Sequence, residues 1–208
     1  FEDADIDNAI HWAVEAIFRN AGQICLAGSR LFVHSSLYES FMERFVAAAE
    51  ALTIGDPFDP ATKFSSLASK RHFDKVASYV ESARELGGTI RTGGVAEDGS
   101  WVVRPTIIDG LALDAAPYCE EIFGPVCVVN SFDTEEEVVH LANDTRYGLN
   151  AMLFTENLSR AHRVASKLRA GTVWVNCFFI RDLRTPFGGV GDSGVGREGG
   201  NFSREFFT

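Results

Sequence analysis

The sequence predicts an α/β fold in which a largely parallel sheet is covered by helices on both faces. Several segments carry apolar residues at helical spacing. Short apolar runs lie between them, as in strands that are buried on both faces. Because strand and helix patterns alternate along the chain, parallel pairing is favoured. The 208 residues are enough for one α/β domain with a full core.

The first half of the chain contains three predicted helices and one predicted strand. Gly22 and the pair Gly87-Gly88 end two of the helical patterns, as glycine commonly does just past a helix. A Ser-x-x-Glu capping box opens another helix. The predicted elements are a helix over residues 5–22, a strand over 30–34, a helix that follows the box Ser36-x-x-Glu39 and extends to Leu52, and a helix over 69–86.

The second half repeats the alternation in shorter units. Thr134 and Asn157 are typical helix-capping residues, and Gly171 ends the second of the helices that they open. The predicted elements are a strand over residues 126–129, a helix from Thr134 through Ala142, a strand over 149–154, a helix from Asn157 to Leu168 and a strand over 172–175.

A glycine-rich segment over residues 181–200 has no periodicity. Such a composition suits either a flexible linker or an ordered loop with unusual backbone angles. Residues 189–194 fit the pattern G-x-G-x-x-G. No strand leads directly into that pattern and no apolar helix follows it, so a nucleotide-binding interpretation is weak.

Composition and charge exclude several classes of function. The formal net charge of −10 and the absence of a basic stripe argue against nucleic-acid binding. No apolar run approaches the roughly 20 residues of a membrane helix, and the acidic start is unlike a signal peptide. The four cysteines form no Cys-x-x-Cys pair, so we expect no metal site and reduced thiols in a cytoplasmic protein.

Cys25 is the first candidate for chemistry. A lone cysteine is usually a small buried apolar residue. Here a polar turn that contains Gly22 places the thiol beyond the end of a helix, where it can face a cleft. Its own backbone N–H is then available to a developing oxyanion.

Four motifs then carry a family resemblance over nearly the whole chain. Together they resemble the signatures of aldehyde dehydrogenases, in the order found in that family. The motifs are Asn20-x-Gly22-Gln23-x-Cys25 with Arg30 five residues on, Glu121-Ile122-Phe123-Gly124-Pro125, Asn143-x-x-x-Tyr147-Gly148-Leu149, and Pro186-Phe187-Gly188-Gly189 followed by Ser193-Gly194-x-Gly196-Arg197-Glu198.

The resemblance implies a catalytic domain that oxidises an aldehyde to its acid. Cys25 would be the nucleophile, passing through a thiohemiacetal and a thioester. Glu121 would accept hydrogen bonds from the nicotinamide-side ribose of NAD, with NADP as the alternative, and Phe123 would pack near the nicotinamide ring. Without the resemblance, Glu121 reads as a solvated charge and Phe123 as a core aromatic.

The segment after Asn176 implies a choice of substrate. In the family this residue begins the loop that shapes the substrate entrance, and the string Arg181-Asp182-Leu183-Arg184 resembles semialdehyde dehydrogenases of aromatic catabolism. Such substrates, 2-hydroxymuconic semialdehyde for example, carry a carboxylate that arginine pairs with well. We expect Arg181 or Arg184 to bind it. The alternative is that both arginines only pair with local acids.

The resemblance also implies what this chain lacks. Residues 1–208 would be a fragment without the N-terminal NAD-binding domain and without the C-terminal oligomerisation strand of a homodimeric or homotetrameric parent enzyme. We therefore expect the isolated fragment to be inactive as a dehydrogenase. Two other interpretations remain open, namely acyl transfer by a thiol esterase and a non-catalytic structural or oligomerisation domain.

Overall fold

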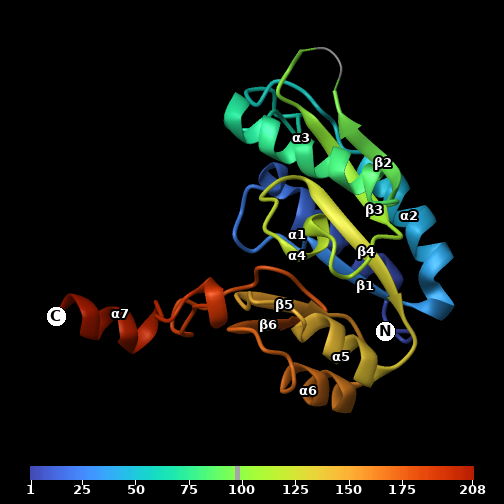
Figure 1. Ribbon diagram of the computed structural model, residues 1–208. Coiled ribbons are helices and arrows are strands. Elements are labelled where there is room, and N and C mark those ends of the chain that lie inside the picture. The colour runs from blue at the N-terminus through green and yellow to red at the C-terminus, as the bar shows by residue number, and fades with distance from the viewer. Residues whose placement is uncertain (97–98) are drawn as a thin grey trace. The chain divides into compact units, whose positions relative to one another are not determined.

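The computed structural model describes residues 1–96 and 99–208, which form two compact units. The central unit comprises residues 10–131, and the flanking unit combines residues 1–9 with residues 132–208. Figure 1 colours the chain by residue number, so both parts of the flanking unit can be followed.

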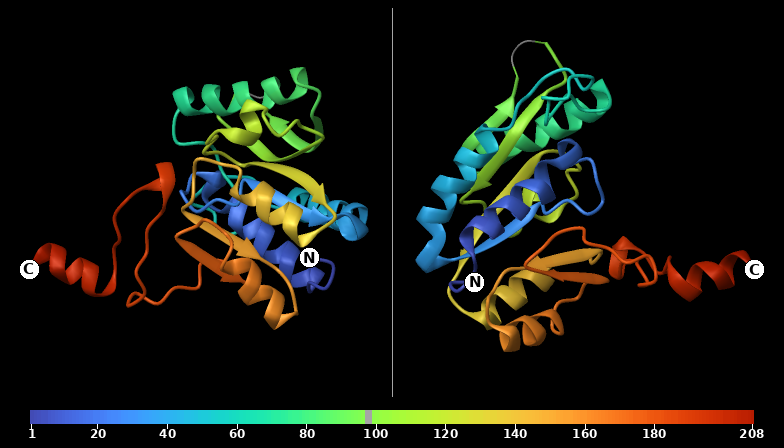
Figure 2. Two further views of the ribbon diagram at one scale, coloured as in Figure 1. Left: turned by 60° about the horizontal axis from the view of Figure 1, so that its bottom comes forward. Right: turned by 180° about the vertical axis from the view of Figure 1, so that it is seen from behind.

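A four-stranded sheet forms the frame of the central unit. Its elements are α1 (Ile6–Phe18), β1 (Arg30–His34), α2 (Tyr38–Glu50), α3 (Lys70–Glu85), β2 (Thr89–Val95), β3 (Val103–Asp109), α4 (Ala116–Cys119) and β4 (Val126–Phe132). The strand order is β1-β4-β3-β2, with β3 parallel to β4 and antiparallel to β2. Helices α2 and α3 both pack on β2 and β3, and they run along the sheet in Figure 2.

The core of the central unit lies on both sides of the sheet. Four consecutive residues of β4, Val126–Val129, are almost completely buried, and β3 shows the same pattern at Ile107 and Ile108. Because successive side chains of a strand point to opposite faces, a run of buried residues means that both faces are covered. The predicted α/β class is confirmed, with a mixed sheet of mostly parallel strands.

Several helix boundaries differ from the sequence prediction, since the helix predicted to Leu52 ends at Glu50 and the one predicted to Leu168 ends at Ala165. The first helix ends at Phe18 and not at residue 22, because Asn20 and Ala21 take left-handed backbone angles. The box Ser36-x-x-Glu39 does not cap α2. Instead the ring of His34 accepts a hydrogen bond from the backbone N–H of Ser36, which lies in a separate 3₁₀ turn.

Three later helices begin at side-chain caps, of which those at Thr134 and Asn157 confirm the sequence prediction. Ser69 accepts a hydrogen bond from the backbone N–H of His72 at 3.3 Å and begins α3. Thr134 and Asn157 do the same for the two helices of the flanking unit, at 3.1 and 3.0 Å. A side-chain acceptor at this position satisfies an N–H that has no partner within the helix.

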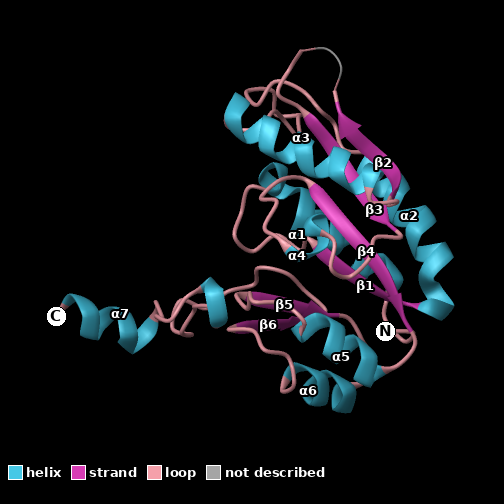
Figure 3. Ribbon diagram, viewed as in Figure 1, coloured by secondary structure: helices cyan, strands magenta, loops and turns pink. Residues whose placement is uncertain are grey.

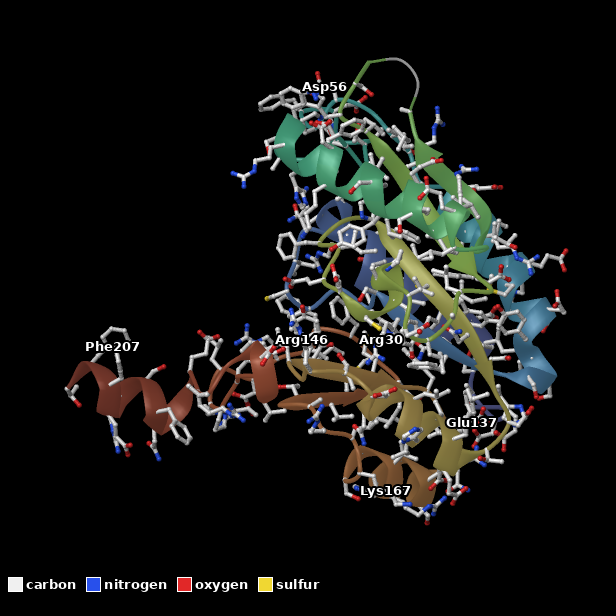
Figure 4. All side chains as sticks on the ribbon, in the orientation of Figure 1. Arg30, Asp56, Glu137, Arg146, Lys167 and Phe207 are labelled. Atoms are coloured by element: carbon white, nitrogen blue, oxygen red, sulfur yellow. The ribbon has the colours of Figure 1, made fainter. Side chains whose placement is uncertain are left out.

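The flanking unit has its own two-stranded parallel sheet and small core. Its elements are α5 (Glu135–Asn143), β5 (Asn150–Leu153), α6 (Leu158–Ala165), β6 (Thr172–Val175) and α7 (Gly200–Phe207). Leu153, Ala161 and Val164 form the core, against which Val139 and Val173 pack. Figure 3 shows the segment between β6 and α7 as loop, apart from the 3₁₀ turn η3 (Gly191–Ser193).

A polar cluster ties α2 to the edge of the central sheet. Arg91 on β2 donates from Nε to Asp109 Oδ2 at 2.7 Å, and the Tyr38 hydroxyl lies 3.3 Å from the same oxygen. Burial, together with the Asp109 carboxylate, raises the pKa of Tyr38 to about 12. The cluster therefore keeps Tyr38 protonated and leaves Asp109 dependent on Arg91 for its charge partner.

Arg91→Ala is expected to lower the free energy of unfolding by about 1–3 kcal/mol, because it leaves the buried Asp109 carboxylate without its cation. The loss stays below that of a fully buried pair, since the Arg91 side chain is 40% exposed. Urea denaturation measures the effect. Arg104→Ala on β3 is the control, because Arg104 is exposed, and a similar loss there would contradict the assignment.

The described residues contain no helix that combines the length and the apolar character needed to cross a membrane.

Candidate functional site

Cys25 follows a turn with unusual backbone angles. Asn20 and Ala21 have φ of 53°, and Gly22 has φ of 66°. The left-handed region costs a residue with a Cβ roughly 1–2 kcal/mol, so the surrounding structure must hold this turn in place. The turn leaves Cys25 exposed while Leu26 beside it is buried. The backbone thus directs the thiol away from the core.

The polar residues of this motif brace the turn. Asn20 Nδ2 donates to the carbonyl of Gln23 at 3.0 Å, and the backbone N–H of Gln23 donates to the carbonyl of Asn20 at 3.0 Å. The Gln23 side chain then accepts a hydrogen bond from the backbone N–H of Ala68 at 3.0 Å. Asn20 and Gln23 therefore act on the position of Cys25 through the backbone.

Glu121 and Phe123 lie on a loop of the same unit. Both are exposed, and the buried Ile122 between them anchors the segment. Phe123 has φ of 59°, and 36% of its surface is exposed. A large aromatic residue in the left-handed region is uncommon, and such strain often occurs at functional sites.

One face of α3 supports this loop. His72 Nε2 lies 2.6 Å from the carbonyl oxygen of Phe123, and Lys75 Nζ donates to the carbonyl of Glu121 at 2.9 Å. A Cβ added to Gly124 would lie 2.7 Å from a methyl group of Val76, so the loop approaches the helix closely there. The three α3 residues are spaced three and four positions apart and so share one helix face.

The two motif segments of the central unit pack directly against each other. A Cβ on Gly22 would overlap the carbonyl group of Gly124. Only glycine fits at this contact, and its φ of 66° is also one that glycine adopts without strain. Although nearly one hundred residues separate them in sequence, the turn before Cys25 and the loop of Glu121 and Phe123 form one structural region.

Asn176 lies in the flanking unit, and its polar groups are engaged in holding the backbone. Its side chain accepts from the Thr155 N–H at 3.0 Å and donates to the Thr155 carbonyl at 2.9 Å. The carbonyl of Asn176 accepts from Asn8 Nδ2 at 2.9 Å. With φ of 56°, Asn176 ends β6 and sets the direction in which the following loop leaves it.

Both candidate arginines have acidic partners within the flanking unit. Arg181 lies 3.2 Å from Glu198, and its guanidinium lies 4.5 Å from the centre of the Phe187 ring. Arg184 donates from Nε to both carboxylate oxygens of Asp182, at 2.9 and 3.1 Å, and is 91% exposed. Arg184 fits the alternative of a local pair, whereas Arg181 is more enclosed and stacked on an aromatic ring.

The model for the aldehyde dehydrogenase family matches residues 1–208, the whole chain. The chain belongs to the aldehyde dehydrogenase family. It is 50% identical to the 2-hydroxymuconic semialdehyde dehydrogenase of Pseudomonas sp. strain CF600, and 44% identical to the human 2-aminomuconic semialdehyde dehydrogenase. Each of these alignments covers all of this chain and 44% of the relative, so the chain spans less than half of their length.

The structure agrees with solved aldehyde dehydrogenases. The chain superposes on the NAD⁺ complex of an aldehyde dehydrogenase from Bacillus cereus with a TM-score of 0.94 at 41% identity, covering 98% of this chain and 42% of the other. The resemblance seen in the sequence motifs is therefore confirmed at the level of family and fold.

The glycine-rich segment that carries the last of the four motifs, residues 186–198, is an ordered loop. The backbone N–H of Gly148 donates to the Ser193 hydroxyl at 3.0 Å, and its carbonyl accepts from the Val190 N–H at 2.9 Å. Phe187 and Glu198 form an antiparallel bridge. Of the two interpretations left open by the sequence, the ordered loop is correct, and two signatures are joined through Gly148.

The sequence motifs did not indicate His72 and Lys75, which hold the loop of Glu121 and Phe123, or Asn8, which binds the Asn176 carbonyl in the flanking unit. Each is a polar residue on a helix, Lys75 exposed and His72 and Asn8 partly buried, and such residues give no periodic apolar signal. Their partners lie 51, 46 and 168 residues away along the chain. The described residues contain no group of three or more His, Cys, Asp or Glu side chains suited to hold a metal ion.

Brief treatment with iodoacetamide is expected to alkylate Cys25 first. Cys127 is buried, and burial raises the pKa of its thiol to about 12, while partial burial raises the pKa of Cys177. Cys119 is exposed like Cys25, but its thiol donates to the carbonyl of Leu113 at 3.0 Å. Peptide mass spectrometry measures the order in which the cysteines are alkylated. Faster labelling of any other cysteine would contradict the prediction that Cys25 is the most reactive.

Proposed function

We propose that the full-length protein oxidises an aldehyde bearing a carboxylate, such as 2-hydroxymuconic semialdehyde, to the corresponding acid with NAD. The observation that carries the proposal is the contact between the strained turn of Cys25 and the loop of Glu121 and Phe123. The exposed Cys25 thiol follows that turn, and the exposed Glu121 carboxylate and Phe123 ring lie on that loop, so one region combines a nucleophile with groups suited to a ribose and a nicotinamide.

Cys25 supplies the covalent chemistry. Its thiolate adds to the aldehyde carbon, and the carbonyl oxygen becomes the oxyanion of a thiohemiacetal. The backbone N–H of Cys25 is a candidate donor to that oxygen. Loss of a hydride from the same carbon leaves a thioester on Cys25, and water then hydrolyses the thioester to release the acid and the free thiol.

Glu121 and Phe123 are suited to the nicotinamide end of the cofactor. NAD, when bound, supplies the hydride acceptor. The exposed Glu121 carboxylate can accept hydrogen bonds from ribose hydroxyls, and the Phe123 ring offers an apolar surface to the nicotinamide. NAD is proposed over NADP because the structure from Bacillus cereus holds NAD⁺.

The substrate carboxylate is assigned to Arg181. The contact with the Phe187 ring keeps the Arg181 guanidinium in place. Glu198 approaches the guanidinium with one carboxylate oxygen at 3.2 Å, so other N–H groups of Arg181 can donate to the substrate carboxylate. Phe178 is only 2% exposed and packs on Trp174, so it belongs to the core and not to the substrate surface. Ile180 is exposed in the same loop and offers apolar contact.

The direct test is steady-state turnover by the full-length protein, followed by NADH absorbance. A semialdehyde with a distal carboxylate is compared with an uncharged aldehyde of the same length. The proposal expects a higher kcat/KM for the carboxylated substrate. Equal values for the two substrates would remove the assignment of substrate class but leave the dehydrogenase chemistry in place.

Arg181→Ala is expected to raise KM for the carboxylated semialdehyde about tenfold, the size of one charge-assisted hydrogen bond. The uncharged aldehyde should be almost unaffected. Arg184→Ala is the matched control, since Arg184 already pairs with Asp182. Equal losses on both aldehydes in Arg181→Ala would mean that the arginine braces its loop through Glu198 and does not contact the substrate.

A further inference from the structure

We propose that His72 is a positioning residue that holds Phe123 in the orientation needed at the cofactor contact. The proposal rests on the proposed function, because the orientation of Phe123 matters for catalysis only if a nicotinamide ring binds beside it. His72 lies in the first turn of α3, 51 residues before Phe123 in the sequence.

His72 contacts Phe123 in two ways. Its Nε2 lies 2.6 Å from the Phe123 carbonyl oxygen, and the two rings meet edge to face with centroids 6.0 Å apart at 66°. One side chain therefore fixes both the backbone and the ring of the same residue. Since Phe123 has φ of 59°, a value that residues with a Cβ rarely adopt, this conformation requires such an external contact.

The neighbours of Phe123 are held by other groups. Ile122 is buried, Glu121 is bound through its carbonyl by Lys75, and Gly124 lies against Val76. These contacts fix where the loop runs, but none of them acts on the Phe123 carbonyl. His72 is the described side chain that hydrogen-bonds to that carbonyl.

The contact with the Phe123 carbonyl also requires a proton on Nε2 of His72. A carbonyl oxygen only accepts, so Nε2 must carry a proton and donate it. The neutral tautomer with Nε2–H and the imidazolium both meet this requirement. The backbone N–H of His72 donates to the Ser69 hydroxyl at 3.3 Å, which fixes the helix turn that carries the ring.

The test is a double-mutant cycle on the full-length protein, read by calorimetric titration with NAD. His72→Ala is expected to weaken NAD binding about three- to tenfold, as the loss of one hydrogen bond would. His72→Gln keeps a side-chain N–H donor at a similar distance from the backbone, so it is expected to restore most of the affinity for NAD. In a Phe123→Gly background, His72→Ala should cause almost no further loss, because the ring it positions is gone.

Hydrogen exchange without NAD gives a second readout. His72→Ala should speed exchange in peptides covering residues 120–126, while Glu85→Ala at the far end of α3 should not. Equal NAD losses in the wild-type and Phe123→Gly backgrounds would overturn the proposal, since His72 would then act without Phe123. Failure of the wild-type protein to bind NAD would overturn the proposed function instead. Exchange alone would then decide whether His72 holds Phe123.

Discussion

Replacing Cys25 by serine in the full-length protein is expected to lower the rate of aldehyde oxidation at least about a thousandfold. A hydroxyl at this position is protonated at neutral pH and adds poorly to an aldehyde without a base to activate it. The thiohemiacetal and the thioester then do not form at a useful rate. Because Cys25 is exposed, the free energy of unfolding should change by less than about 0.5 kcal/mol.

Cys119→Ser is the matched control for this substitution. Cys119 is exposed in the same unit, and a serine hydroxyl can donate to the Leu113 carbonyl as the thiol does. Its turnover should stay within about twofold of the wild type, on the scale of a surface substitution. Activity of Cys25→Ser within tenfold of the wild type, measured by NADH absorbance, would contradict the assignment of the nucleophile.

Gly22→Ala is expected to lower the free energy of unfolding by about 2–5 kcal/mol. Roughly 1–2 kcal/mol comes from placing alanine in the left-handed region, and roughly 1–3 kcal/mol comes from overlap of its Cβ with the Gly124 carbonyl. The overlap should also displace the turn before Cys25 and slow alkylation of its thiol. Urea denaturation and timed iodoacetamide labelling measure the two effects.

Gly87→Ala separates the cost of the left-handed backbone from the cost of the steric overlap. Gly87 has φ of 85°, yet a Cβ there would meet no atom within 4 Å. It should therefore lose only the backbone contribution, about 1–2 kcal/mol. If Gly22→Ala and Gly87→Ala lose the same free energy, the contact between the turn and the Gly124 loop is not a tight one.

Elements with a strong local signal could be predicted from the sequence, and β2 and β3 could not. Helix α3 has a serine cap, one apolar face and Gly87 just after it, all of which act within the helix itself. The sequence of β2 contains Gly93 and Gly94, both at positive φ, and its register against β3 shifts twice. A bulged strand is fixed by the strand beside it, so its own residues show no clear alternation.

The candidate site also has a part that could be predicted from the sequence and a part that could not. The sequence motifs name Cys25, Glu121 and Phe123, and the structure shows that all three are exposed. The supporting contacts from His72 and Lys75 were not predictable, because they reach backbone carbonyls, which every residue has. The sequence does not indicate which backbone carbonyl a donor on a helix surface will bond to after folding.

The division of the flanking unit between residues 1–9 and residues 132–208 has a consequence for biosynthesis. Thr155 donates its hydroxyl to Asp3 across 152 residues, at 2.8 Å. Residues 10–131 are continuous in sequence, so the central unit can fold once they have left the ribosome and before residues 132–208 have done so. The first nine residues must wait for their partners, and closing so long a loop is entropically costly. Nascent chains that have released residues 10–131 but not residues 132–208 should therefore hold a folded central unit, while residues 1–9 still lack their partners and stay open to proteases and chaperones.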